Sequence, residues 1–409
     1  MDAVVMDGKG DGAGQTEQQH NDHAESLSGI SPTGGFFFTS PFRSLATQGC
    51  FKPITQPAAG GEALNSPFQQ TVQQAFAQAR DAGIAHPILC GAIPFDTQQP
   101  SALFVPKEVQ WFERQSFLDR TQMTTGDVPH VTHKTEHPAQ PEFMQMVSSA
   151  VEATSRGALR KVVLSRLLEI ETQRPVDNAA LMARMIEQNP GGYHFHVPLE
   201  KGALMGASPE LLLRKLGNHF HSNPLAGSAR RNSDPVQDDA VKNALRTSAK
   251  DAYEHHIVTD GMREVLAPRC SHLHIPSQPE LLSTPALWHL ASPIDGDVAD
   301  SAENALSLAC LLHPTPALCG TPTVSARELI SQLEPFDRGL FGGIVGWCDA
   351  QGNGEWVVTI RCGTVHGRQV RLFAGAGIVP DSVPESEWAE TGTKLSTMMR
   401  AFGLNPLCT

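Results

Sequence analysis

Two pairs of acidic residues have the spacing that a divalent-cation site built on helices requires. Asp251 and Glu254 lie in KDAYEHH, and Glu387 and Glu390 lie in SEWAETG. A spacing of three residues puts both members of a pair on one helix face, so each helix can offer carboxylates to a shared cation. Such pairs are also common on solvated helix faces. The residues alone leave both interpretations open.

A lysine and a glutamate are candidates for proton transfer. Lys161 opens KVVLSR, where it is either a solvated charge at a strand end or a buried amine. Glu210 ends GASPE, whose small residues let backbone or ligand come close. It is either a general acid whose pKa is raised by burial or an exposed carboxylate in a turn.

Two further segments are suited to binding anions. In PLAGSARR, the backbone N–H groups of Gly227 and Ser228 form a plausible seat for a carboxylate. Arg361 lies in the apolar segment WVVTIRC, which predicts a strand, so its guanidinium must reach the surface or pair with an anion. Lys394, one helical turn beyond Glu390, is expected to face the same place.

Other conspicuous residues give weaker signals. Gly375 and Gly377 in FAGAGIV resemble a shortened GxG, but no third glycine completes a dinucleotide-binding motif. His289 and His313 have apolar neighbours, which is more typical of a hydrogen-bonded core histidine than of a catalytic one.

These residues must be positioned by a mixture of helices and strands. Hydrophobic periodicity and capping signals predict both kinds of element, and the strands cluster rather than alternate strictly with helices, which favours an α+β fold. The predicted helices cover residues 66–83, 141–156, 178–192, 234–266, 301–312, 324–333 and 386–402. The predicted strands cover 161–172, 192–198, 203–208, a hairpin at 211–222 and an antiparallel meander over 340–379.

Two segments are expected to stand outside this framework. Residues 1–30 are polar and glycine-rich, with few large apolar residues, so we predict a disordered tail followed by one domain over 31–409. Residues 113–140 are also polar and read as a long surface connection.

Composition excludes several classes of protein. The 409 residues carry a formal net charge of -12 without a basic cluster, which argues against nucleic-acid and anionic-membrane partners. An acidic protein that handles an anionic ligand must supply positive charge locally, from a few lysines and arginines or from a metal ion. The first residues lack the basic and apolar regions expected of a signal peptide, and no apolar run of about 18 residues occurs. Eight cysteines without a CxxC pair are typical of buried, reduced thiols, and the protein is expected in the cytoplasm.

Nine motifs in fixed order resemble those of the chorismate-utilising enzymes, and within them the siderophore-type isochorismate synthases of enterobactin and 2,3-dihydroxybenzoate biosynthesis. The resemblance covers nearly the whole chain from about residue 35. The motifs are KVVLSR, GASPELLLRK, PLAGSARR, LWHLASP, LLHPTPALCG, EPFDRGLFGGIVGW, GEWVVTIRC, RLFAGAGIV and EWAETGTKL.

The resemblance implies one chorismate-binding domain, in which two antiparallel sheets form a sandwich flanked by helices around a Mg²⁺ site. In the implied reaction, water adds at ring carbon C2, the double bonds shift and the C4 hydroxyl leaves. By similarity Lys161 is the general base and Glu210 the general acid. An amine can do this at neutral pH only if its pKa falls well below about 10, and the acid needs an upward shift.

The resemblance also implies the ligand contacts. Glu254 and Glu390 are expected to bind Mg²⁺ directly, with Asp251 and Glu387 behind them through water. The expected contacts to the substrate chorismate come from Gly227, Ser228, Ala317, Arg361, Gly375 and Lys394.

Two related activities and a non-catalytic role remain as alternatives. Ammonia-using relatives work with a glutaminase subunit and usually have threonine in the AGT version of the AGS motif, and anthranilate synthases also lack the lysine. Lys161 and Ser228 therefore favour water as the nucleophile, without a glutaminase partner, in a protein expected to be a monomer. Salicylate synthases share the lysine but then eliminate pyruvate, and Ser228 argues moderately against them. A non-catalytic subunit is disfavoured because Lys161, Glu210, Glu254 and Glu390 are all present.

Overall fold

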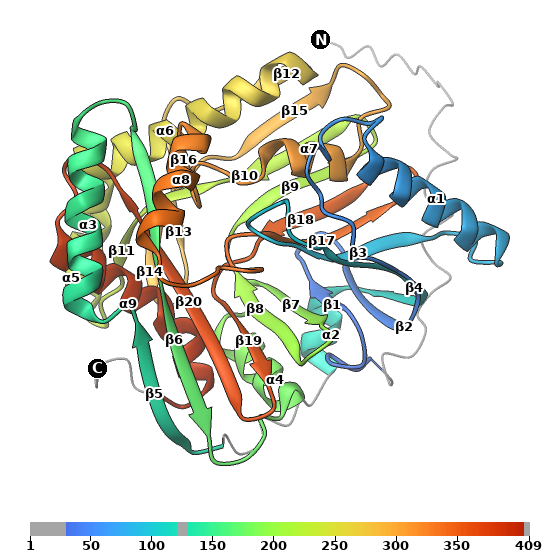
Figure 1. Cartoon of the computed structure of the whole chain (residues 1–409), viewed down its shortest axis with the longest axis horizontal. Helices are drawn as coiled ribbons and strands as arrows, with labels where there is room; N and C mark the ends of the chain where they lie inside the picture. Colours follow the sequence, from blue (N-terminus) through green and yellow to red (C-terminus); the bar gives the residue numbers. More distant parts are fainter. Residues whose placement is uncertain (1–29, 121–128, 405–409) are drawn as a thin grey trace, which may run out of the picture.

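The computed structural model describes residues 30–120 and 129–404 as an α+β fold dominated by antiparallel strands (Figure 1). The α+β class predicted from the sequence is confirmed. Of the predicted tail, only Ile30 lies within the described residues, where it packs against buried side chains.

Most strands belong to one hydrogen-bonded network that has two halves. In the first half each strand pairs with the next in an antiparallel manner. In order, its strands are β5 (Val131–His137), β6 (Lys161–Thr172), β20 (Gln369–Ile378), β19 (Cys362–His366), β8 (Ala203–Ser208), β7 (Tyr193–Pro198) and β1 (Phe37–Thr39). The short strand β16 (Gly320–Thr321) pairs with the beginning of β6.

The second half begins where β1 pairs with β2. It too is antiparallel throughout. In order, its strands are β2 (Ser44–Ile54), β4 (Ala102–Phe112), β3 (Ile88–Ile93), β17 (Ile344–Asp349), β18 (Gly354–Val358), β9 (Leu211–Leu216), β10 (His219–Asn223), β15 (Ile294–Val298) and β12 (Cys270–His274).

The two halves form the layers of the expected sandwich. The largest buried cluster contains Phe195 of β7 and Phe373 of β20 from the first half, together with Leu213 of β9 and Trp356 of β18 from the second. Burial of apolar area between the layers is the main stabilising contribution, at about 25 cal/mol per Å² removed from water.

Helices cover the outer surfaces and the ends of the sandwich (Figure 1). Helices α4 and α9 pack on the outer face of β6, β8 and β20, whereas α3 and α8 bury the beginning of β6 and the end of β20. The helices are α1 (Pro67–Asp81), α2 (Arg114–Arg120), α3 (Gln140–Ser155), α4 (Asn178–Gln188), α5 (Pro235–Thr247), α6 (Ala249–Leu266), α7 (Ala305–Leu312), α8 (Thr323–Leu333) and α9 (Pro384–Ala401), with a 3₁₀ turn at Ala267–Arg269.

A separate three-stranded antiparallel sheet adjoins the sandwich. It consists of β11 (Leu225–Arg230), β14 (Leu287–Ala291) and β13 (Glu280–Ser283), with β14 in the centre. Helices α5 and α6 pack against β11 and β14. This sheet carries the PLAGSARR and LWHLASP motifs, so it brings them side by side.

Capping contacts confirm one predicted helix and divide another. Ser66 accepts a hydrogen bond from the backbone N–H of Gln69, and Pro67 occupies the first turn of α1, where it needs no N–H partner. The predicted helix over 234–266 is instead two helices. Ser248 has extended backbone angles and its hydroxyl accepts from the N–H of Asp251, which begins α6.

Two further predictions were wrong in detail. The segment 113–140 is not merely a connection, since it contains α2 and the polar strand β5, which pairs with β6. The meander over 340–379 is two hairpins, β17–β18 and β19–β20. Strand β18 pairs with β9 and β19 with β8, so the chain changes layers between them.

The cysteines agree with the sequence prediction of reduced, mostly buried thiols as far as the structure describes them. Within the described ranges every cysteine is a free thiol, and most are buried; Cys408 lies outside those ranges. No helix in the described ranges combines the length and apolar content needed to cross a membrane.

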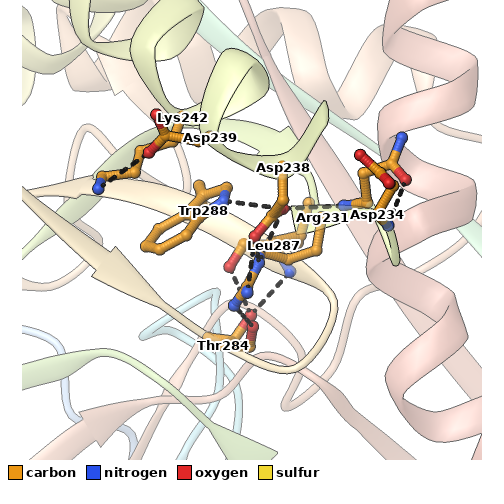
Figure 2. A network of polar contacts seen from close by, with 9 residues as sticks. Arg231, Asp234, Asp238, Asp239, Lys242, Thr284, Leu287 and Trp288 are labelled. Carbon is orange, nitrogen blue, oxygen red and sulfur yellow. Dashed lines mark hydrogen bonds and ion pairs between the residues drawn. The ribbon is translucent and has the colours of Figure 1, made fainter. Parts of the chain in front are cut away.

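A polar network fastens α5 to the three-stranded sheet (Figure 2). The Asp238 carboxylate accepts from Arg231 Nε at 2.8 and 3.0 Å and from Trp288 Nε1 at 3.1 Å. The Arg231 guanidinium lies 4.3 Å from the centre of the Trp288 ring. The pKa of Asp238 is lowered from 3.8 to about 2, chiefly by the hydrogen bonds that Arg231 donates.

We predict that Asp238→Asn lowers the urea midpoint of unfolding at neutral pH. A carboxyl whose pKa is lowered by folding stabilises the protein above its unfolded value of 3.8 and loses that contribution as the pH falls towards 2. The difference between the variant and the parent should therefore narrow below about pH 4. Urea titrations followed by tryptophan fluorescence measure both effects.

Asp239→Asn is the matched control for this prediction. Asp239 lies on the same helix, but its carboxylate is exposed. Its ion pair with Lys242 Nζ, at 3.5 Å, is a surface pair that contributes little to stability. Equal midpoints for the parent and Asp238→Asn would contradict a fastening role for the network.

Candidate active site

The candidate site lies where the chain crosses between the two halves of the network. Glu210 is in the link from β8 to β9, and Arg361 is in the link from β18 to β19. Backbone hydrogen bonds tie the crossings to their surroundings, from Val358 N to Glu210 O at 3.1 Å and from Ala207 N to Arg361 O at 3.0 Å. The two crossings therefore run beside one another.

Arg361 differs from the sequence prediction because it is not within a strand. It precedes β19 and has φ of 48°, the only non-glycine residue in the described ranges with positive φ. Such backbone is costly for an arginine and is found mainly where function fixes it. The side chain is buried, and this burial lowers the pKa of the guanidinium to about 10, still well within the charged range at neutral pH.

Lys161 is a buried amine rather than a solvated charge. It begins β6 and its side chain has no exposed area; its Nζ lies 2.9 Å from Glu254 Oε1 on α6. Gly377 makes room for this ion pair, because a Cβ there would come within 2.1 Å of Glu254 Oε1 and 2.8 Å of Lys161 Cε. The glycine of FAGAGIV therefore provides space rather than a dinucleotide-binding turn.

Glu210 is a buried carboxyl with few partners. It is 2 % exposed, and its Oε1 accepts a long hydrogen bond of 3.4 Å from Leu225 N. Burial raises its pKa to about 7, against the opposing effects of the Leu225 N–H and the positive charges of Arg361, Lys161 and Lys394. A substantial fraction of Glu210 is therefore protonated at neutral pH.

The AGS motif, residues 226–228, lines the site at an irregularity in strand β11. The register between β11 and β14 shifts between Leu225 and Ser228, and Gly227 there has φ of 80°. A Cβ on Gly227 would lie 3.0 Å from Asp251 Cβ, so glycine allows α6 to approach. His255 on α6 fixes this segment, with Nδ1 3.0 Å from Ala226 O and Nε2 2.8 Å from the Ser292 hydroxyl.

The four acidic residues predicted on helices lie near one another and near three lysines. Asp251 and Glu254 are on α6, and Glu387 and Glu390 are on α9. Besides the Lys161–Glu254 pair, Lys250 Nζ lies 2.8 Å from Glu387 Oε1, and Lys394 Nζ lies 2.6 Å from Glu390 Oε1. The structure therefore brings both acidic pairs into one cluster with cationic partners.

The carboxylates of this cluster influence one another. Burial raises the pKa of Asp251 and of Glu387, and the neighbouring charge of Glu390 adds to both shifts. Burial alone would also raise the pKa of Glu390, but Lys394 and Lys250 outweigh it, so this pKa is lowered. Mutual repulsion between the carboxylates is thus only partly balanced by the lysines.

Whether these residues fit a divalent cation depends on their chemistry and their placement. As placed, no three histidine, cysteine or acidic side chains within the described ranges converge to hold a metal ion. The donor chemistry nevertheless fits Mg²⁺, because all four groups are carboxylates and the buried Glu387 Oε2 has no hydrogen-bond partner.

Most of the predicted site residues line one pocket. The space left by protein atoms, including the part open to solvent, is about 550 Å³. The predicted residues that line it are Glu210, Gly227, Ser228, Glu254, Ala317, Arg361, Gly375 and Lys394. Lys161, Asp251, Glu387 and Glu390 do not line it, although Lys161 and Glu390 each contact a residue that does.

His289 is buried, as a core histidine would be, but it also lines the pocket. It lies opposite Ser228 on β14, and its buried Nε2 has no hydrogen-bond partner. Burial, with Arg361 and Lys394, lowers its pKa far below 6.5, so the ring is neutral. The sequence alone could not place His289 in the pocket, because its position opposite the AGS motif depends on the register between β11 and β14. His313 behaves as predicted, with Nε2 bonded to Pro94 O at 2.9 Å.

Comparison with known proteins identifies the family. Residues 104–403 match the family model described as chorismate binding enzyme. The chain is 55% identical to isochorismate synthase EntC of Escherichia coli K12 over 372 residues, which is 90% of this chain and 95% of the relative. It is 40% identical to isochorismate synthase DhbC of Bacillus subtilis 168 over 380 residues, 91% of this chain and 94% of the relative.

A solved structure agrees with these relatives. The crystal structure of the Bacillus anthracis protein assigned as 2,3-dihydroxybenzoate-specific isochorismate synthase, DhbC, superposes with a TM-score of 0.84 at 38% identity. The superposition covers 93% of this chain and 98% of that one. Together the matches show that the chain belongs to the chorismate binding enzyme family, in its isochorismate synthase branch.

Proposed function

We propose that this protein is an isochorismate synthase, which converts chorismate reversibly to isochorismate by adding water at C2 and expelling the C4 hydroxyl. The observation that carries the proposal is Glu210, a buried carboxyl with a pKa of about 7 in a pocket that also contains Arg361 and Lys394. An acid held half-protonated beside positive groups suits proton donation to the leaving group of an anionic substrate.

Lys161 is the proposed general base. Its amine is fully buried next to the pocket-lining Glu254, on the strand whose Val163 also lines the pocket. Because Glu254 pairs with this amine at 2.9 Å and also lines the pocket, it links the proposed base to the substrate site.

The substrate carboxylates are proposed to bind the positive side of the pocket. Arg361 and Lys394 supply charge, and the N–H groups of Gly227 and Ser228 supply hydrogen bonds. Ala317 and Gly375 line the same space, where small side chains leave room for the ring. The local positive charge that an acidic chain needs is therefore available in the pocket.

Mg²⁺ is the proposed cofactor. Glu254 and Glu390 would bind it directly and Asp251 and Glu387 through water, which would relieve the repulsion among these carboxylates. When bound, the ion supplies positive charge that orients a substrate carboxylate.

The wider role follows from the relatives. We propose that the product feeds synthesis of 2,3-dihydroxybenzoate for a catecholate siderophore such as enterobactin. The enzyme would work in the cytoplasm as a monomer, without a glutaminase subunit, as one domain over 31–409.

Product identification tests the proposal. The purified protein incubated with chorismate and Mg²⁺ should give isochorismate and stop at a mixture of both, because one allylic hydroxyl is exchanged for another. Chromatography with mass detection follows the products. Salicylate with pyruvate would identify a salicylate synthase instead, and no product in the presence of bound chorismate would identify a non-catalytic chorismate-binding protein.

Replacing Lys161 by alanine should reduce turnover by about 10²- to 10⁴-fold, the usual contribution of a general base. Folding and chorismate binding should largely persist, because the groups proposed to bind the substrate lie on other elements. Steady-state kinetics, circular dichroism and calorimetric titration with chorismate measure these three properties. A turnover near that of the parent would remove Lys161 as the base.

The pH profile should report Glu210. Its carboxyl must be protonated to act as the acid, so kcat/KM should fall as the pH rises above about 7. Glu210→Gln should lose most turnover at every pH, since an amide is too weak an acid to protonate the leaving hydroxyl. If kcat/KM of the parent stays flat from pH 7 to beyond pH 9, the assignment of Glu210 is wrong.

A further inference from the structure

The strand that carries Lys161 has a gap on one edge. Strand β16 pairs with β6 at Lys161 and Val162, and β5 pairs with it from Leu167 onward. Between them, residues 163–166 face no strand on that edge, although β20 pairs along the other edge. Unpaired backbone groups in a buried strand are costly, so something else must bind them.

Two charged side chains, Glu334 and Arg338, fill this gap. Glu334 Oε1 accepts from Ser165 N at 2.7 Å, and Arg338 Nη2 donates to Val163 O at 2.7 Å. The two side chains are joined by hydrogen bonds of 2.6 and 2.8 Å. They take the place of a neighbouring strand over the middle of β6.

The same arginine reaches a second segment of the pocket wall. Arg338 Nη1 donates to Leu318 O at 2.9 Å, and Val163 N donates to Cys319 O at 2.8 Å. Both Val163 and Leu318 line the pocket. One guanidinium thus sets the distance between the strand of Lys161 and the loop that contains Ala317.

The pair is buried, so its geometry is well defined. The side chains of Glu334 and Arg338 are 1 % and 3 % exposed, and the guanidinium lies 4.4 Å from the centre of the Phe95 ring. A buried ion pair is weak evidence for stability, because desolvation of both charges offsets their attraction. The planar, forked guanidinium of Arg338, however, binds several acceptors at once in a fixed geometry, which the ammonium group of a lysine cannot do.

We propose that Glu334 and Arg338 are positioning residues for the reaction. They hold the beginning of β6, and with it Lys161, in register with the Leu318 loop, so that the base and the ring pocket keep their relative placement. This inference rests on the proposed function of Lys161. Misplacement of a reacting group by about 1 Å can cost on the order of 100-fold in rate.

Arg338→Lys is the first test, because it keeps the charge and loses the fork. At a temperature where circular dichroism shows the variant fully folded, kcat should fall about 10- to 100-fold. KM for chorismate should change little, because Arg361 and Lys394 are untouched. A folded variant with the kcat of the parent, or a fall that only follows the loss of folded protein, would overturn the proposal.

Arg338→Ala with added guanidinium is the second test. Glu334 and Arg338 also line an outer cavity with Phe95 and Arg327, of about 930 Å³ including the part open to solvent, through which a small cation can enter. Guanidinium at millimolar, non-denaturing concentrations should raise kcat of this variant in a saturable manner and leave the parent unchanged. Absence of rescue in a folded variant would count against positioning by the fork. If this variant does not fold, Arg338→Lys decides the question.

Arg327→Lys is the matched control. Arg327 lines the same outer cavity and pairs with Asp96, but both side chains are partly exposed and neither lines the substrate pocket. Its kcat and KM should equal those of the parent. A parent without turnover would reject the proposed function itself, whereas an active parent with unaffected Arg338 variants would reject only the positioning role.

Discussion

The site depends on one constraint of topology: two of the places where the chain passes between the two layers of the sandwich lie together. Strands β8 and β9 belong to different halves, as do β18 and β19, and backbone hydrogen bonds hold the crossings in place. A residue in a crossing leaves the alternation of a strand and can point between the layers. Glu210 and Arg361 occupy these positions, and Arg361 adopts left-handed backbone there.

Burial then gives these groups their chemical properties. In the low-dielectric interior an isolated charge is expensive, so Glu210 is held partly neutral and His289 is held fully neutral. Lys161, Lys250 and Lys394 each form an ion pair of 2.6 to 2.9 Å with a carboxylate on α6 or α9. The pocket therefore contains a partly protonated carboxyl and a neutral ring beside paired charges, although the chain as a whole is acidic.

Many elements follow from local signals in the sequence. Ser66 and Pro67 mark the start of α1, and the spacing of three in Asp251–Glu254 and Glu387–Glu390 correctly placed each pair on a helix. The failures have identifiable causes. Ser248 is a helix cap that interrupts an apparently continuous helical pattern, and β5 is so polar that only its pairing with β6 makes it a strand. Local propensity is weak evidence where tertiary pairing supplies the hydrogen bonds.

The sequence by itself determined the α+β class, the helical carboxylate pairs and, through its ordered motifs, the family. It left Lys161 undecided between a surface charge and a buried amine, and it found His289 more typical of a core histidine than of a catalytic one. Tertiary structure decided both, because burial and charge pairing depend on residues far apart in the chain: Gly377 makes room for the Lys161–Glu254 pair, and strand register sets His289 opposite Ser228. No pattern of neighbouring residues encodes these distances, which arise only when the two layers and the helices pack together.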